Sequence, residues 1–200
     1  MSAPPPTVTA LRPLGRGRVD IELDGVRWRA VSVEAVHRAG LSVGVTLERR
    51  RARELRRELR RQESLAVAVR ALRVRDHTTA SLEARLEQRG IAVAQRASTL
   101  ETLARAGVVD DERFANTRAA GLATRGCGDL LIAADLELRG IPSSLICEAI
   151  AGIEAESARA ERLVDARGLT AKTLRTLAAK GFSEGSLEVF VAQVESGAIG

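Results

Sequence analysis

The sequence predicts a mostly α-helical protein: an elongated array of three tandem three-helix repeats, preceded by a small N-terminal element containing a β-hairpin and by a long linking helix. Two observations predict this class. The 200 residues include one Trp, three Phe and no Tyr, so Leu, Val, Ile and Ala must build the core. Such a core suits packed helices better than a β-sandwich. From Glu48 to the end, the apolar residues recur with helical spacing.

The first 47 residues do not follow the helical pattern. Residues 1–15 hold four of the five prolines and predict a flexible tail. Residues 16–47 predict a small β-rich element, because apolar and charged residues alternate on both sides of Asp24-Gly25. Alternation around Asp-Gly indicates a hairpin, since its turn needs positive φ. We expect Trp28, on the second strand, to pack inside this element.

The hairpin is followed by two weaker signals. Ser32 can cap a short helix that ends at Gly40. Val43, Val45 and Leu47 alternate with other residues and could form one more strand.

Residues 48–63 predict an arginine-rich linking helix. Glu54 lies four residues after Arg50 and Glu58 lies three residues before Arg61, so ion pairs support the helix. Few of its residues are apolar, which leaves two interpretations open: a solvated helix that bridges two parts of the chain, or a surface that faces phosphates.

The remaining chain divides into repeats at 64–109, 110–153 and 154–200. Each repeat contains a basic residue, a glycine and an apolar residue in succession: Arg89-Gly90-Ile91, Arg139-Gly140-Ile141 and Lys180-Gly181-Phe182. This step predicts a helix end, with glycine in the left-handed conformation and the basic side chain near the negative end of the helix dipole. Helices are expected before and after each step.

Polar residues at the predicted helix starts agree with this division. Thr78 can cap the second helix of the first repeat, and Asp110-Asp111 can cap the first helix of the second. Phe114, on that helix, is expected to anchor the interface between the first two repeats.

Charge and composition restrict the function. The net charge is +5 and the basic residues are almost all arginine, which favours nucleic acid or an acidic protein surface as partner. No phosphate-binding loop motif is present, and His37 and His77 are too far apart in sequence to predict zinc. We expect His77 to be solvated. The sequence predicts no catalytic residue, metal or cofactor, and therefore no enzyme.

The sequence also disfavours a disulfide-stabilised, a membrane-spanning or a secreted protein. Cys127 and Cys147 cannot form a disulfide scaffold, so we expect free thiols and a cytoplasmic protein. No apolar run is long enough to span a membrane, and the first residues lack the apolar stretch of a secretory signal.

The repeats carry the motifs of a known family. Arg75-x-x-Thr78-x-x-x-Leu82-x-x-x-Leu86-x-x-Arg89-Gly90 is followed by Gly107-Val108-Val109-Asp110-Asp111-Glu112-Arg113-Phe114-Ala115, the most specific stretch, and by Lys180-Gly181-Phe182-Ser183. Over about residues 48–195 the chain resembles the RecX family, regulators of the bacterial RecA recombinase. Ser81 departs from the family pattern, which usually has Glu there, and Arg96 occupies a position that is commonly apolar.

The resemblance implies a non-catalytic modulator that lies in the groove of the recombinase filament on single-stranded DNA. It would suppress ATPase, strand-exchange and co-protease activities, and so regulate DNA repair, homologous recombination and the SOS response. The alternative is a basic, sequence-independent DNA-binding protein without a recombinase partner. A monomer is expected. The candidate contacts with recombinase or DNA are Arg53, Arg56, Arg57, Arg60, Arg61, Arg75, Arg118 and Arg125, and the structural motif residues are Asp110, Asp111, Phe114, Gly90, Gly140 and Gly181.

Overall fold

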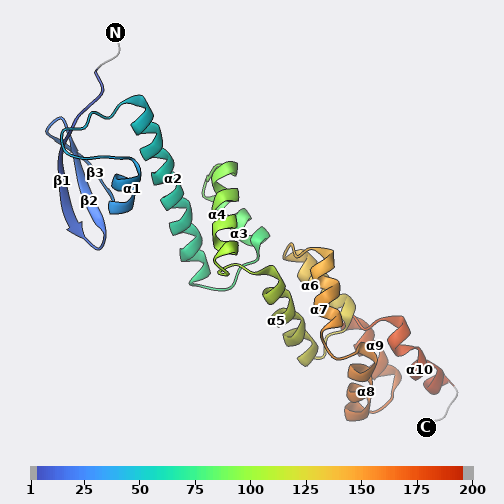
Figure 1. Ribbon diagram of the computed structural model, residues 1–200. Helices are drawn as coiled ribbons and strands as arrows, with labels where there is room; N and C mark the ends of the chain where they lie inside the picture. The colour runs from blue at the N-terminus through green and yellow to red at the C-terminus, as the bar shows by residue number, and fades with distance from the viewer. Residues whose placement is uncertain (1–3, 196–200) are drawn as a thin grey trace. The chain divides into compact units, whose positions relative to one another are not determined.

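The computed structural model describes residues 4–195 (Figure 1). The chain divides into two compact units. The first contains the residues up to Arg70 together with Gly90–Thr99, and the second contains Ala71–Arg89 together with the residues from Leu100 onward.

A three-stranded antiparallel sheet forms one side of the first unit. Its strands are β1 (Val8–Gly15), β2 (Arg18–Leu23) and β3 (Val26–Ser32), in the order β1-β2-β3. The turn between β2 and β3 has φ of 50° at Asp24 and 80° at Gly25, so the predicted hairpin is confirmed. This left-handed conformation is the one that Asp-Gly hairpin turns require.

The prediction of a flexible tail over residues 1–15 is wrong for residues 8–15. Residues 8–15 form strand β1, with Val8 fully buried. Pro13 is accommodated because β1 is an edge strand, where a missing backbone N–H need not break the sheet. Residues 1–3 of the predicted tail lie outside the described residues. The strand expected at residues 43–47 is also wrong, since only Thr46 forms an isolated bridge there, with Thr7.

Trp28 is not packed inside the element as expected, because it is 41% exposed. The buried residue of β3 is Val31, which lies opposite the buried Val19 of β2. Residues directly opposite one another in a sheet share a face. The pairing then moves from Ile21↔Arg29 to Glu22↔Arg27, so Trp28 is passed over at a bulge.

Two helices complete the first unit's core. Helix α1 (Val33–Arg38) begins at Ser32, whose hydroxyl accepts a hydrogen bond from the Ala35 amide at 3.0 Å, as predicted. Helix α2 (Arg49–Leu72) contributes Leu55 to the core. Helix α2 runs unbroken across residue 63, so the predicted linking helix and the first helix of repeat one are a single helix.

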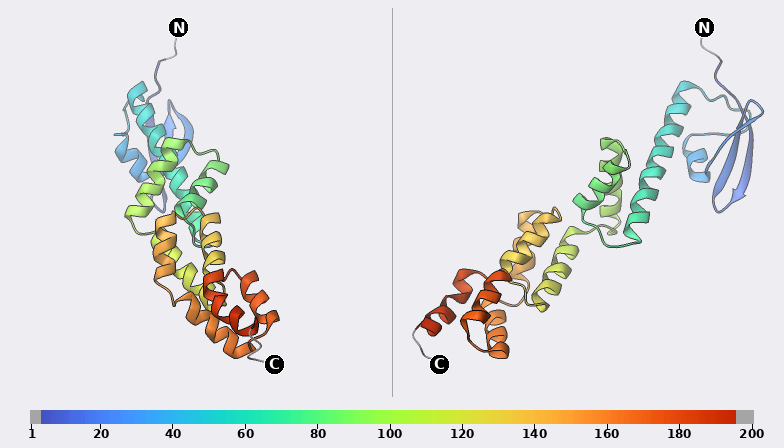
Figure 2. Two further views of the ribbon diagram at one scale, coloured as in Figure 1. Left: turned by 90° about the vertical axis from the view of Figure 1, so that its right-hand side faces the viewer. Right: turned by 180° about the vertical axis from the view of Figure 1, so that it is seen from behind.

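The other helices follow the predicted repeats. They are α3 (Thr79–Gln88), α4 (Val93–Arg105), α5 (Asp111–Thr124), α6 (Asp129–Leu138), α7 (Ser143–Ala151), α8 (Glu156–Arg167), α9 (Ala171–Ala179) and α10 (Glu184–Glu195). Helices α5–α7 form one group and α8–α10 form the next, and Figure 2 shows these groups following one another along the second unit. Each group has its own buried cluster, so the predicted helical-repeat class is confirmed.

The three predicted helix-ending glycines have positive φ: 71° at Gly90, 73° at Gly140 and 80° at Gly181. After two of them the chain folds back on the helix as predicted. The Ile141 amide donates to the Leu136 carbonyl at 3.1 Å, and the Phe182 amide donates to the Leu177 carbonyl at 3.2 Å.

Two of these glycines also permit close contact between consecutive repeats. A Cβ added at Gly140 would lie 2.4 Å from the Cβ of Ala80, at the start of α3. A Cβ added at Gly181 would lie 2.5 Å from the backbone nitrogen of Leu131, at the start of α6. The end of one helix therefore packs on the start of the equivalent helix in the preceding repeat.

Hydrogen bonds join the repeats at the same places. The Arg139 carbonyl accepts from the Thr78 hydroxyl at 2.7 Å, and the Lys180 carbonyl accepts from the Gly128 amide at 2.9 Å. An acid at the start of the next repeat's first helix adds a second bond. Asp111 accepts from the Thr79 amide at 2.8 Å, and Glu156 accepts from the Asp129 amide at 2.5 Å.

Glu156 is more buried than Asp111, since only 8% of its surface is exposed. Burial by itself would raise the pKa of Glu156, but hydrogen bonds from Ser183, Ser186 and backbone amides lower it overall. The carboxylate therefore stays charged in the interface between the second and third repeats.

Candidate functional site

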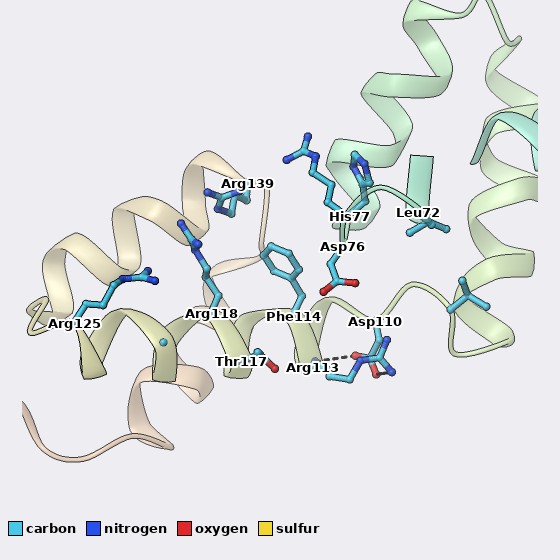
Figure 3. Close-up of a pocket in the computed structure, with 13 residues that line it drawn as sticks. Leu72, Asp76, His77, Asp110, Arg113, Phe114, Thr117, Arg118, Arg125 and Arg139 are labelled. Carbon is cyan, nitrogen blue, oxygen red and sulfur yellow. Dashed lines mark hydrogen bonds and ion pairs between the residues drawn. The ribbon is translucent and has the colours of Figure 1, made fainter. Parts of the chain in front are cut away.

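A groove of about 580 Å³ runs beside α5 in the second unit (Figure 3). Its lining comes from the end of α2 and the loop that follows it, from the loop that precedes α5, from α5 itself, and from the residues that end α5 and α6. Its lining residues are Leu72, Arg75, Asp76, His77, Val108, Asp110, Arg113, Phe114, Thr117, Arg118, Gly121, Arg125 and Arg139.

The groove brings together three arginines that the sequence analysis proposed as contacts, Arg75, Arg118 and Arg125. Arg113 and Arg139 join them, so five guanidinium groups line one hollow surface with two carboxylates. Guanidinium groups bind phosphates and carboxylates through paired hydrogen bonds. The groove can therefore bind a negatively charged partner.

Arg118 is already engaged within the protein. Its Nε and one Nη each lie 2.8 Å from an oxygen of Asp135 on α6, and Arg139 lies 2.9 Å from the same carboxylate. Hydrogen bonds from Arg118 and then Arg139 hold the pKa of Asp135 far below its usual range. Arg118 thus fixes α5 to α6 and contributes positive charge to the groove.

Arg75 and Arg125 differ from Arg118, since both are exposed. Neither side chain forms an ion pair or hydrogen bond with any residue in the part of the chain that the structure describes. The Arg125 side chain extends from the end of α5 into the groove in Figure 3. These two arginines are therefore the groove cations most available to a partner.

Arg113, which sequence reasoning did not propose, lies 3.7 Å from the Asp110 carboxylate. Asp110 also caps α5 as predicted, by accepting from the Arg113 amide at 2.9 Å. The most specific stretch of the sequence, residues 107–115, already contained Arg113, so that motif was the signal for it.

His77 is buried rather than solvated, which corrects the expectation. Its Nδ1 lies 3.0 Å from the Ser81 hydroxyl. Burial, followed by the positive charges of Arg75 and Arg85, lowers the pKa of His77. The neutral ring therefore forms part of the groove wall.

Phe114 is half-buried and packs against the core of the second repeat. Its ring points from α5 into the groove, on the side of Asp76 and His77 in Figure 3. Its role as an anchor between the first two repeats stays a prediction, and the hydrogen bonds between these repeats are formed at Asp111 and Thr78.

The five proposed arginines of α2 lie outside this groove. Arg53, Arg56, Arg57 and Arg60 are exposed, whereas Arg61 is partly buried. Arg61 lies 2.9 Å from Glu58 and 3.5 Å from Glu34. Their role as contacts stays a prediction, and Arg61 has a structural partner already.

The cysteines, the possible metal ligands and the apolar helices are further features of the described residues. Cys127 is half-buried, Cys147 is exposed, and both are free thiols. No group of three or more His, Cys, Asp or Glu side chains among residues 4–195 could hold a metal ion. Over the same residues, no helix has the length and apolar character needed to cross a membrane.

Comparison with known sequences finds one family. The family model described as RecX, second three-helix domain, matches residues 110–150, which correspond to α5–α7. A regulatory protein RecX of Mycolicibacterium vanbaalenii is 39% identical over 109 residues, covering 52% of this chain and 59% of that protein, which is less than two thirds of its length. A regulatory protein RecX of Mycobacterium avium is 32% identical over 151 residues, covering 68% of this chain and 87% of that protein.

Comparison with solved structures finds the same fold. The crystal structure of a regulatory protein RecX matches with a TM-score of 0.77 and 17% identity, over 94% of this chain and 99% of that one. The crystal structure of RecX from Lactobacillus salivarius matches with a TM-score of 0.58 and 16% identity, over 68% of this chain and 97% of that one.

Proposed function

The chain belongs to the RecX family of regulatory proteins, and from this premise we propose that it is a non-catalytic inhibitor of a RecA-type recombinase. It binds the filament that the recombinase forms on single-stranded DNA and suppresses ATP hydrolysis, strand exchange and co-protease activity. It would thereby regulate DNA repair and the SOS response, acting as a cytoplasmic monomer. The observation that carries this proposal is the similarity to a regulatory protein RecX over 87% of that relative's length.

The groove beside α5 supports a function based on binding. It presents exposed Arg75 and Arg125 next to an arginine pair that Asp135 holds in place. A recombinase filament on DNA offers both carboxylates and phosphates, and arginine suits both. The hydrogen bonds between repeats keep these arginines in fixed relative positions within the unit.

Titration of recombinase ATPase activity on single-stranded DNA tests the proposal. We expect inhibition at well below one copy of this protein per recombinase monomer, which would indicate capping or destabilisation of the filament. ATPase activity unchanged at every ratio would refute the proposal. If salt-sensitive DNA binding persisted in that case, the protein would be the alternative, a basic DNA-binding protein without a recombinase partner.

A further inference from the structure

A second cluster of arginines lies in the first unit, around a cavity of about 610 Å³. Strands β2 and β3 contribute Arg18 and Arg29, and helix α2 contributes Arg56 and Arg60. Arg56 and Arg60 are four residues apart, so they are neighbours on one helix face. The other lining residues are Ala30, Val31, Ser32, Leu59, Gln62, Glu63 and Ala66.

The acids of this unit leave these four arginines largely uncompensated. Glu58 pairs with Arg61 and Arg38, and Asp20 pairs with Arg27. Glu63 is the one acid among the residues that line the cavity. Within residues 4–195, no ion pair involves Arg18, Arg29, Arg56 or Arg60.

Four guanidinium groups around one cavity repel one another, and a bound anion relieves that repulsion. Arg18 is held in place because one Nη donates to the Ala30 carbonyl at 3.1 Å, which leaves its other N–H groups available. The cavity volume lies within the range of about 300–1,000 Å³ typical of ligand pockets, so it can hold more than a single phosphate group.

An exposed aromatic ring, Trp28, lies against Arg29, one of the arginines that line this cavity. The Arg29 guanidinium is 5.6 Å from the centre of the Trp28 ring, and Trp28 is 41% exposed. Proteins that bind single strands combine arginines that follow the backbone with aromatic rings on which bases stack. A duplex would not present an unstacked base to Trp28, and an acidic peptide has no base to stack there.

We propose that this cavity binds a single strand of nucleic acid. Arg18, Arg29, Arg56 and Arg60 contact consecutive phosphates, and Trp28 stacks on a base next to them. This site is separate from the groove beside α5 and needs no recombinase, so its failure would leave the regulator proposal standing.

Trp28 supplies the measurement, because the protein has one Trp and no Tyr. The full-length protein is titrated with oligothymidylate, without recombinase, while Trp28 fluorescence is recorded at several salt concentrations. We expect saturable quenching that weakens with salt. Each phosphate contact on a single strand contributes about 0.7 to the log–log salt slope, so Arg56→Ala with Arg60→Ala should reduce the slope by about 1.4.

Arg49→Ala with Arg70→Ala is the matched control. Both residues are exposed on α2, carry the same charge and lie outside the cavity lining. This control should reduce the slope far less than the cavity pair. Equal losses from the two pairs would overturn the proposal, because they would indicate a diffuse charge effect. Absence of quenching would overturn it too.

Competitors and a further variant distinguish the ligand. Inorganic triphosphate or polyglutamate that binds as tightly as the strand would overturn the assignment to nucleic acid. Trp28→Ala should weaken binding of a labelled oligothymidylate, followed by anisotropy, at least about fivefold through loss of stacking. Unchanged affinity in Trp28→Ala would also overturn the proposed arrangement.

Discussion

The carboxylate of Asp111 accepts a hydrogen bond from the backbone amide of Thr79, so the first residue of α5 lies at the N-terminus of α3. The same relationship recurs one repeat later, where Glu156, the first residue of α8, accepts from the amide of Asp129, the first residue of α6. A helix N-terminus carries partial positive charge, which favours an acid there. The recurrence indicates that this contact is how one repeat is fixed to the next.

Asp111→Ala should therefore destabilise the second unit. The substitution leaves the Thr79 amide without its acceptor, and loss of a hydrogen bond to a charged group costs about 1.5–3 kcal/mol. The measurement is the free energy of urea-induced unfolding, together with amide exchange at Thr79, which should become faster. Glu112→Ala is the control, since it removes the same charge from an exposed neighbour and should cost less than about 1 kcal/mol. Equal losses of unfolding free energy in Asp111→Ala and Glu112→Ala would contradict the contact between Asp111 and Thr79.

The contact at Gly140 gives a second prediction. Gly140→Ala meets both a positive φ of 73° and the Cβ of Ala80 at 2.4 Å, whereas Gly90→Ala meets a φ of 71° with open space. The left-handed conformation alone costs about 1–2 kcal/mol. Thermal unfolding should therefore show a larger loss for Gly140→Ala than for Gly90→Ala, and a larger one still for Gly140→Val.

A second substitution isolates the contact from the backbone strain. Ala80→Gly removes the atom that a Cβ at position 140 would meet, so it should recover stability in the Gly140→Ala background. If Ala80→Gly gives no recovery, the close approach of the two repeats does not explain the difference.

The Asp135 carboxylate predicts a pH dependence. Its folded-state pKa is lowered, chiefly by Arg118, so it stabilises the folded protein above its unfolded pKa of about 4. That contribution is lost as the pH falls below about 4. The unfolding free energy lost in Asp135→Asn should therefore be greatest near neutral pH and should shrink as the pH falls from about 4 towards 2. A loss that grew on acidification would contradict this origin.

Much of the fold was predictable because the signals were local. The Asp24-Gly25 turn, the Ser32 cap and the start of α5 after Asp110 each depend on residues within a few positions of one another. Strand β1 was missed because prolines suggested a tail, although an edge strand accommodates Pro13. The alternation of apolar and charged residues predicts a buried Trp28, but a bulge in β3 interrupts that alternation. Only the pairing with β2 reveals the bulge.

The candidate site was predictable only in part. Arg75, Arg118 and Arg125 were proposed, and they do line one groove. The partner of Arg118, Asp135, lies 17 residues away, and no local pattern indicates that pair. Arg18 and Arg29 were missed for the same reason, since strand pairing and α2 bring them beside Arg56 and Arg60.

The groove arginines give a prediction about inhibition. Arg75→Ala with Arg125→Ala removes the two exposed groove arginines whose side chains form no ion pair among the described residues, so it should raise the concentration needed to inhibit recombinase ATPase by about tenfold, a loss near 1.4 kcal/mol. Arg167→Ala with Arg175→Ala is the control, because both residues are exposed and lie outside the groove. Inhibition by the control pair should stay close to that of the unmodified protein. An unaffected Arg75/Arg125 variant would place the recombinase contact elsewhere.

The arginines of α2 give the last prediction, because they are not equivalent. Glu58 is buried, and its pKa is lowered although burial alone would raise it, since Arg61 donates hydrogen bonds to its carboxylate. Arg61→Ala would leave Glu58 with Arg38 at 3.5 Å as its remaining basic neighbour and should cost about 1–3 kcal/mol of stability. The exposed Arg60→Ala should change stability by less than about 0.5 kcal/mol.

The contribution of these arginines to inhibition is therefore tested best with substitutions that leave Arg61 in place. Replacing Arg56, Arg57 and Arg60 with Ala should weaken recombinase inhibition while the melting temperature stays unchanged. Adding Glu58→Gln to Arg61→Ala should recover part of the lost stability, because the uncompensated charge is then removed. If Glu58→Gln recovers no stability, the stability lost in Arg61→Ala does not come from an unpaired Glu58 carboxylate. If the triple variant still inhibits fully, the α2 arginines are not recombinase contacts.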